Sequence, residues 1–125
     1  MRNRGSLVSS FRNALTGLNE LLRTQRNARI HLAITLAVIG LAAWLRLSAA
    51  DWALLAVTAA LVWTAELINT ALEAVVDLAS PGRQPLARLA KDLSAAAVLV
   101  AAVGAAVVGA LVLAPPLFRR VYWSP

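Results

Sequence analysis

The stretch Glu66-Leu-Ile-Asn-Thr-Ala-Leu-Glu-Ala-Val-Val-Asp77 puts four polar side chains into a segment that is otherwise apolar enough to cross a lipid bilayer. These side chains are Glu66, Asn69, Glu73 and Asp77. On an α-helix, which turns by about 100° per residue, all four fall within an arc of about 80° and form one polar stripe. A charged side chain at membrane depth costs at least about 3 kcal/mol, so such residues usually face protein or water and mark functional sites. The alternative is a buried polar network that holds helices together, which rarely needs three acids.

The composition is that of a single-domain integral membrane protein, all-α, covering residues 1–125. Of the 125 residues, 60% are hydrophobic and only 14% are charged. The absence of cysteine excludes disulfides, thiolate metal sites and thiol catalysis, and the single histidine excludes a multi-histidine metal site within one chain. The net charge is +6, and the basic residues lie beside apolar segments without aromatic residues interleaved among them. Anionic lipid headgroups, and not nucleic acid, are therefore the expected partners of the basic residues.

Residues 1–29 predict an amino-terminal amphipathic surface helix, over about 6–28, that lies on the cytoplasmic face of the membrane. Six arginines occur in this segment. Its apolar residues recur with helical spacing: Leu7, Val8, Phe11, Leu15, Leu18, Leu21 and Leu22. Since an apolar run follows at once, the arginine side chains are expected to reach lipid phosphates.

Three apolar runs predict transmembrane helices, over about 30–47, 52–78 and 86–113. The first two are separated by a short polar turn between Trp44 and Trp52, which are expected in an aromatic belt at the outer interface. The sequence Ser80-Pro-Gly-Arg-Gln-Pro85 has the turn chemistry to separate the second and third spans, and Pro115-Pro116 is expected to end the third. His31 begins the first span, where a hydrogen-bonded packing role is favoured over a ligand role.

The distribution of basic residues predicts a plasma (inner) membrane protein whose amino terminus is cytoplasmic. In that orientation nine of the twelve basic residues lie inside, and three lie outside. The three outer residues are Arg46, Arg119 and Arg120. The same orientation gathers Glu73, Asp77, Lys91 and Asp92 at the cytoplasmic face, where ATP is available.

A carboxylate at lipid depth, joined by a polar stripe to acids and a lysine at the water boundary, suits phosphoryl transfer to a lipid alcohol. Glu66 would be the general base for the buried hydroxyl. Glu73, with Asp77, offers hard carboxylate oxygens to Mg²⁺, and Lys91 can balance the charge of the ATP phosphates. The same residues could instead line a proton or cation path, because acids within spans also occur there.

Two motifs on these spans resemble the prokaryotic diacylglycerol kinase and undecaprenol kinase family. They are the stretch from Glu66 to Asp77 and the later stretch Ala90-Lys-Asp-Leu-Ser-Ala-Ala-Ala-Val-Leu99. The segments Phe11 to Gly17 and Arg26-Asn-Ala-Arg-Ile-His31 look like the amino-terminal helix of the family. The resemblance implies a small homotrimeric membrane kinase with a surface helix and three spans, which uses Mg-ATP at active sites between neighbouring subunits.

The resemblance also implies a role for each matching position. Glu66 matches the catalytic base, beside the lipid substrate, and Glu73 matches a metal-binding glutamate at the nucleotide. The other nucleotide-binding positions are Asn69, Asp77, Gln84, Lys91 and Asp92, and the other lipid-substrate positions are Trp44 and Arg29. Gln84 replaces a common loop histidine. Gln25 stands where the family usually has a second metal-binding glutamate, and its amide oxygen can coordinate Mg²⁺ but brings no charge.

Two functions therefore follow from the sequence. The first is a lipid kinase that phosphorylates diacylglycerol or undecaprenol, and the sequence leaves these two substrates open because either chain needs the same apolar groove. The second is a catalytically silent relative that acts as a lipid-binding or conducting membrane assembly, which the neutral Gln25 favours.

Overall fold

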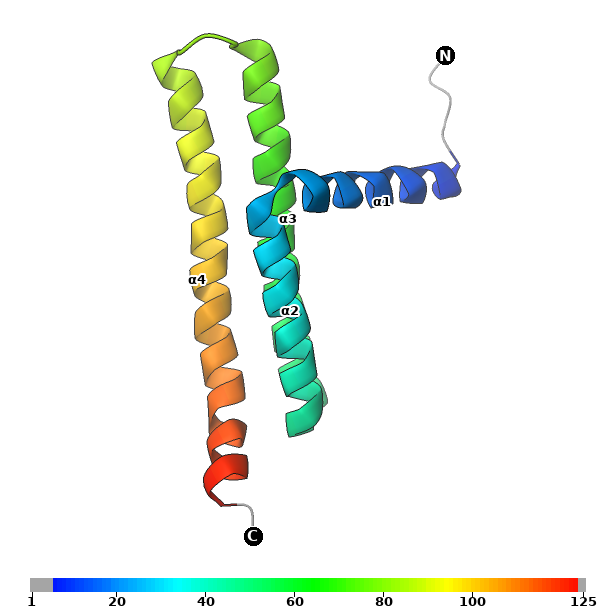
Figure 1. Cartoon of the computed structure of the whole chain (residues 1–125), viewed down its shortest axis with the longest axis vertical. Coiled ribbons are helices and arrows are strands. Elements are labelled where there is room, and N and C mark those ends of the chain that lie inside the picture. Colours follow the sequence, from blue (N-terminus) through cyan, green and yellow to red (C-terminus); the bar gives the residue numbers. More distant parts are fainter. Residues whose placement is uncertain (1–5, 124–125) are drawn as a thin grey trace.

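A computed structural model describes residues 6–123, and this part of the chain folds into four helices without any strand. The helices are α1 (Leu7–Thr24), α2 (Arg26–Leu45), α3 (Ala49–Ala79) and α4 (Pro85–Tyr122). Within the described part, α2, α3 and α4 are each long and apolar enough to cross a membrane. The predicted all-α architecture, with one helix before three long apolar helices, is confirmed and is consistent with a membrane protein (Figure 1).

The first helix extends sideways from the start of α2, crosswise to the direction of the other three helices, and contacts α2 and α3 (Figure 1). Gln25 is the hinge between α1 and α2: its extended backbone, with φ −104° and ψ 117°, ends one helix and precedes the next. The predicted surface helix over about 6–28 therefore ends earlier, at Thr24, and residues 26–28 belong to α2. No glycine or proline stands at this break, so the sequence carries no local signal for it.

The turn between α2 and α3 is fixed by local hydrogen bonds. Arg46 adopts the left-handed conformation, with φ 54° and ψ 52°, and ends α2. Ser48 caps α3, because its Oγ accepts a hydrogen bond from the backbone N–H of Asp51 and donates one to the Asp51 carboxylate. This cap starts α3 at Ala49, three residues before the predicted start.

The fourth helix continues through Pro115 and Pro116 to Tyr122, so the predicted end near Leu113 is wrong. Each proline lacks one N–H group, but the fixed φ of proline is compatible with a helix, and helices in membranes tolerate such interruptions. The last turn of α4 reaches the end of α2, where the Arg120 guanidinium lies 5.0 Å from the centre of the Trp44 ring. This cation–π contact places both residues far from the amino-terminal end of α2.

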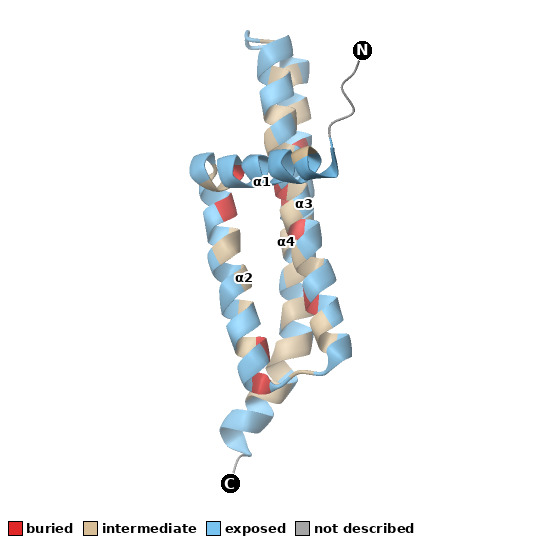
Figure 2. Ribbon diagram, turned by 90° about the vertical axis from the view of Figure 1, so that its right-hand side faces the viewer, coloured by how far each residue is buried: buried red, intermediate tan, exposed pale blue. Residues whose placement is uncertain are grey.

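Packing within one chain is sparse. The main interhelical contact is between α3 and α4, and α2 lies more loosely against both. The buried apolar residues are Leu21, Ala28, Ala42, Leu45, Leu55, Val62 and Val98. Figure 2 shows them as isolated patches between largely exposed helix faces. The exposed leucine, valine and isoleucine side chains suit a lipid surrounding rather than water.

Candidate functional site

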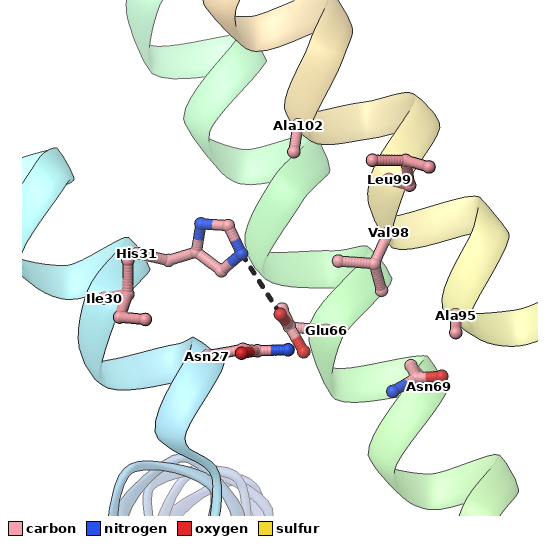
Figure 3. A pocket seen from close by; sticks show the side chains of 9 residues that line it. All are labelled: Asn27, Ile30, His31, Glu66, Asn69, Ala95, Val98, Leu99 and Ala102. Atoms are coloured by element: carbon pink, nitrogen blue, oxygen red, sulfur yellow. Dashed lines mark ion pairs between the residues drawn. The ribbon is translucent and has the colours of Figure 1, made fainter.

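Glu66 is the one acid that the structure buries among residues 6–123, with a relative accessibility of 2%. It projects from the middle of α3 towards α2, where its Oε1 lies 3.1 Å from Nε2 of His31 (Figure 3). The contact is close but does not have the alignment of a hydrogen bond, so Oε1 keeps its capacity to accept one. Catalytic hydrogen bonds are often poorly aligned without substrate.

A cavity of about 320 Å³ opens beside Glu66. The residues that line it are Asn27, Ile30 and His31 of α2, Glu66 and Asn69 of α3, and Ala95, Val98, Leu99 and Ala102 of α4. Figure 3 shows Asn27 and His31 pointing from α2 towards the Glu66 carboxylate, with the small and aliphatic side chains of α4 opposite. The cavity therefore has one polar wall and one apolar wall, as a site for an amphiphile requires.

Hydrogen bonds hold the next polar residue of the stripe. The Ser94 hydroxyl lies 2.7 Å from Oδ1 of Asn69, to which it can donate, and Nδ2 of Asn69 donates a long bond of 3.4 Å to Glu73. Ser94 is buried on α4. The same hydroxyl lies 2.9 Å from the Lys91 carbonyl of its own helix, so its single proton is shared between this carbonyl and the amide oxygen of Asn69. The orientation of Asn69 is thus defined by both long helices.

At the far end of the stripe the charged residues of α3 and α4 meet. Lys91 donates a hydrogen bond to the Asp77 carboxylate. Arg88 and Asp92, one turn apart on α4, form a longer and exposed ion pair at 3.9 Å. Figure 1 shows that this end of the α3–α4 hairpin extends beyond the level of α1. If α1 marks a membrane surface, these charges lie on its aqueous side.

A second cavity, the apolar groove, has a volume of about 510 Å³ and lies between α2, α3 and α4. Its lining is mostly aliphatic and includes Val38, Leu55 and Val62. His31 and Ala102 line both this apolar groove and the cavity beside Glu66. The two hollows therefore adjoin one another at His31.

The candidate metal residues are not gathered within one chain. Among the described residues no three histidine, aspartate or glutamate side chains form a group that could hold a metal ion. Glu73 is half-buried, and its one hydrogen-bond partner within residues 6–123 is the distant Asn69 amide. No hydrogen bond in this part of the chain joins Gln25 to Glu73. The exposed Gln84 precedes α4 without a side-chain cap.

The predicted lipid contacts lie elsewhere. Neither Trp44 nor Arg29 lines the cavity beside Glu66 or the apolar groove. Both side chains are exposed in the single chain. Their assignment to a lipid site therefore stays a prediction.

The sequence did not predict that three further residues contribute to the site beside Glu66 and Asn69. These residues are Asn27, His31 and Ser94. His31 was expected to be a hydrogen-bonded packing residue, and the structure pairs it with the acid of the stripe. The spacing of Asn27 and His31, four residues apart on one helix face, was the available signal. Which acid they would face depends on how α2 docks against α3, and that could not be inferred from either helix alone.

Three long apolar helices that enclose a buried carboxylate beside a histidine define an integral membrane protein with a polar site between its helices. The sequence model for Prokaryotic diacylglycerol kinase matches residues 12–113, and the chain belongs to this family. It is 49% identical over 113 residues to a diacylglycerol kinase of Synechocystis, covering 90% of this chain and 65% of the relative's length. It is 38% identical over 108 residues to an undecaprenol kinase of Bacillus subtilis, covering 86% of this chain and 88% of that protein.

A diacylglycerol kinase of Escherichia coli is 38% identical over 81 residues, which cover 65% of this chain and 66% of that kinase. The chain thus spans about two thirds of the length of two relatives and most of the third. The family and the membrane character inferred from the sequence are confirmed.

Proposed function

We propose that this protein is an ATP-dependent kinase that phosphorylates the hydroxyl group of a membrane lipid alcohol, either diacylglycerol or undecaprenol. The observation that carries the proposal is the burial of Glu66 beside a cavity with one polar and one apolar wall. Glu66 shares one face of α3 with Asn69, Glu73 and Asp77. Family membership supports the same activity, since the relatives are named as kinases of these two lipids.

Glu66 acts as the general base in this proposal. The lipid hydroxyl oxygen attacks the γ-phosphorus of ATP, the bond from that phosphorus to the β–γ bridging oxygen breaks, and the hydroxyl proton passes to the Glu66 carboxylate. ADP leaves with the electron pair of the broken bond. A base at this depth suits an alcohol whose chain remains in the bilayer, and the apolar groove beside His31 offers room for that chain. Trp44 and Arg29 are proposed as further lipid contacts.

The aqueous end of the stripe is proposed to hold Mg-ATP. Magnesium is commonly held by one or two carboxylates together with substrate phosphates and water, so the half-buried Glu73, with Gln25 as a neutral oxygen donor, fits as its protein ligand. Bound Mg²⁺ would offset negative charge on the phosphates. The residues proposed to contact the nucleotide are Asn69, Asp77, Gln84, Lys91 and Asp92.

We also propose that the protein works as a homotrimer, with α1 lying in the cytoplasmic interface of the plasma membrane. The exposed apolar residues Leu7, Val8, Phe11 and Leu15 of α1 support the surface position, because they would enter the lipid while the arginines meet phosphates. Sparse packing within one chain supports association, since further contacts must stabilise the three spans.

The test is a transfer assay with purified protein in mixed micelles, in which radioactive phosphate from ATP is offered to diacylglycerol and undecaprenol side by side. One lipid should be phosphorylated by the wild-type protein, and Glu66→Gln should lower the rate by at least about 100-fold, as expected for loss of a general base. Glu20→Gln, at an exposed position on α1, is the matched control and should retain the rate. Equal activity of Glu66→Gln and the control would refute the role of Glu66.

A second candidate function is a silent relative that binds the lipid without phosphorylating it. The neutral Gln25 favours it, because the resemblance implies a second metal-binding carboxylate at that position. In this case neither lipid would be phosphorylated, while a fluorescent lipid alcohol would still bind to the protein and be displaced by an excess of unlabelled lipid.

A further inference from the structure

His31 is the side chain that contacts the buried Glu66 most directly. Its Nε2 lies 3.1 Å from Oε1 of Glu66, and both side chains are largely shielded, at 19% and 3% relative accessibility. The other ion pairs in residues 6–123 are exposed. An unpaired carboxylate in an apolar interior is costly, so a donor at this distance has a large effect on how the carboxylate is held.

The helix that carries His31 is itself docked by a separate polar contact. One turn later on α2, Thr35 accepts a hydrogen bond of 3.2 Å from the indole N–H of Trp63 on α3. The Thr35 hydroxyl also donates to the carbonyl of His31, at 2.7 Å. The Thr35–Trp63 bond can therefore hold α2 against α3 without His31.

His31 lies where the cavity beside Glu66 adjoins the apolar groove, which is where the hydroxyl end of a lipid substrate would be expected. It lines both the cavity beside Glu66 and the apolar groove. A lipid whose chain occupied the groove would have the imidazole ring between its chain and the Glu66 carboxylate. Figure 3 shows Asn27 and His31 converging on Glu66 from the same side of α2.

We propose that His31 is a positioning residue for Glu66. Its imidazole lies 3.1 Å from Oε1, the fully buried oxygen, and would donate a hydrogen bond to it in the substrate complex, so that the other carboxylate oxygen is directed to the cavity where the lipid hydroxyl arrives. This inference rests on the proposed kinase function and adds to it the group that orients the base. A base that is misplaced by about 1 Å can lose roughly 100-fold in rate, so such a residue matters although it does not touch the reacting atoms.

The test separates the N–H donor of His31 from the volume of its ring. His31→Phe keeps a ring without the donor, and His31→Gln keeps an N–H donor without the ring. Under saturating lipid, His31→Phe should lower kcat by about 30- to 100-fold while the KM for ATP changes by less than about twofold, because nucleotide contacts are untouched. His31→Gln should retain at least about a third of the wild-type kcat, since the amide can donate to Oε1. The control Trp63→Phe removes the same neighbouring interhelical bond from the donor side and should leave kcat within about twofold, because Trp63 lines neither the cavity beside Glu66 nor the apolar groove.

Three outcomes would overturn the assignment: an unchanged kcat in His31→Phe, a kcat of His31→Gln as low as that of His31→Phe, or an equal loss in Trp63→Phe. If His31→Phe does not accumulate in membranes, the kcat of His31→Gln alone decides the question. Failure of the kinase function itself is distinguishable, because the wild-type protein would then transfer no phosphate to either lipid, and the positioning role would fall with it. An active wild type with an inactive Glu66→Gln and an unaffected His31→Phe would refute the positioning role alone.

Discussion

Lys91 of α4 donates a hydrogen bond to Asp77 of α3, fourteen residues earlier in the chain, and so joins the two helices close to their connecting turn. The side chains are 38% and 66% accessible. Exposed ion pairs of this kind contribute little to stability, because water screens the attraction between the charges. Breaking the pair therefore costs little, which would let Lys91 turn from Asp77 to a phosphate oxygen in the proposed nucleotide site.

Replacing Lys91 by alanine should weaken ATP binding much more than it weakens the fold. The KM for ATP should rise by at least about tenfold, since a charge-assisted hydrogen bond contributes roughly 1.5–3 kcal/mol. Steady-state kinetics and thermal unfolding in the same detergent measure the two effects. The control Arg83→Ala removes a positive charge from the neighbouring turn and should change KM by less than about threefold. Equal changes in both variants would mean that net charge alone attracts the nucleotide.

Replacing Ser94 by alanine should release the amide of Asn69. The lost bond between the two helices should cost about 0.5–1.5 kcal/mol of stability, because an interhelical hydrogen bond in a membrane protein is worth about that much. The KM for ATP should also rise several-fold, since Asn69 is proposed to contact the nucleotide. Thr16→Val is the control for stability, because that hydroxyl bonds only within its own helix. Unfolding in a graded series of SDS measures the difference, and a Ser94→Ala protein with wild-type stability and KM would contradict the role of this bond.

Restoring a carboxylate at the hinge with Gln25→Glu should raise turnover at low Mg²⁺ concentration. A second anionic oxygen strengthens binding of a hard cation, so the Mg²⁺ concentration that gives half-maximal rate should fall by about tenfold. The rate at saturating Mg²⁺ should change little. A titration of phosphate transfer against Mg²⁺ checks this, and the control Asn13→Asp, which adds the same charge at an exposed position of α1, should leave the Mg²⁺ dependence unchanged. An unchanged Mg²⁺ dependence in Gln25→Glu would show that other oxygens already hold the cation adequately.

The left-handed conformation of Arg46 predicts different effects on stability for two substitutions that remove the same charge. Arg46→Gly should be neutral or slightly stabilising, because glycine reaches φ 54° without strain. Arg46→Val should destabilise by about 1–2 kcal/mol, because a β-branched side chain is disfavoured at positive φ. Thermal unfolding in detergent should rank the valine variant below the glycine variant. The reverse order would exclude this conformation for the turn.

The proposed orientation can be tested with single cysteines, because the chain has none of its own. Gly82→Cys lies in the α3–α4 turn, where an added Cβ meets nothing within 4 Å, and Ala50→Cys lies exposed at the opposite end of α3. A membrane-impermeant maleimide applied to intact cells should label Ala50→Cys and leave Gly82→Cys unlabelled until the cells are opened. Labelling of Gly82→Cys from outside would invert the topology.

The helices could be predicted from the sequence because their signals are local. Hydropathy marks the three spans, and the Pro-Gly turn after Ser80 marks the α3–α4 connection as the structure has it. Two boundaries could not be predicted. Gln25 breaks the chain without a breaker residue, and Pro115-Pro116 does not break it, because an interrupted hydrogen-bond pattern can be accommodated inside a helix in a membrane.

The site was predicted on α3 and incompletely on its neighbours. The polar stripe follows from helical periodicity, so Glu66, Asn69 and Glu73 could be found directly. Ser94 looked like one of many small residues, and its bond to Asn69 exists only because α3 and α4 pack side by side. His31 likewise gains its significance from tertiary packing. The roles of individual residues in catalysis, metal binding and nucleotide binding remain predictions.

The scarcity of buried side chains in the single chain has a practical consequence. No large side chain in the described part is fully buried, so acyl chains or detergent tails supply much of the close packing that a water-soluble protein finds in its own interior. The free energy of unfolding should therefore depend on the length of the detergent tail and on the protein-to-detergent ratio. Melting temperatures should be compared only at matched mole fractions in one amphiphile, because association and solvation shift apparent stability by mass action.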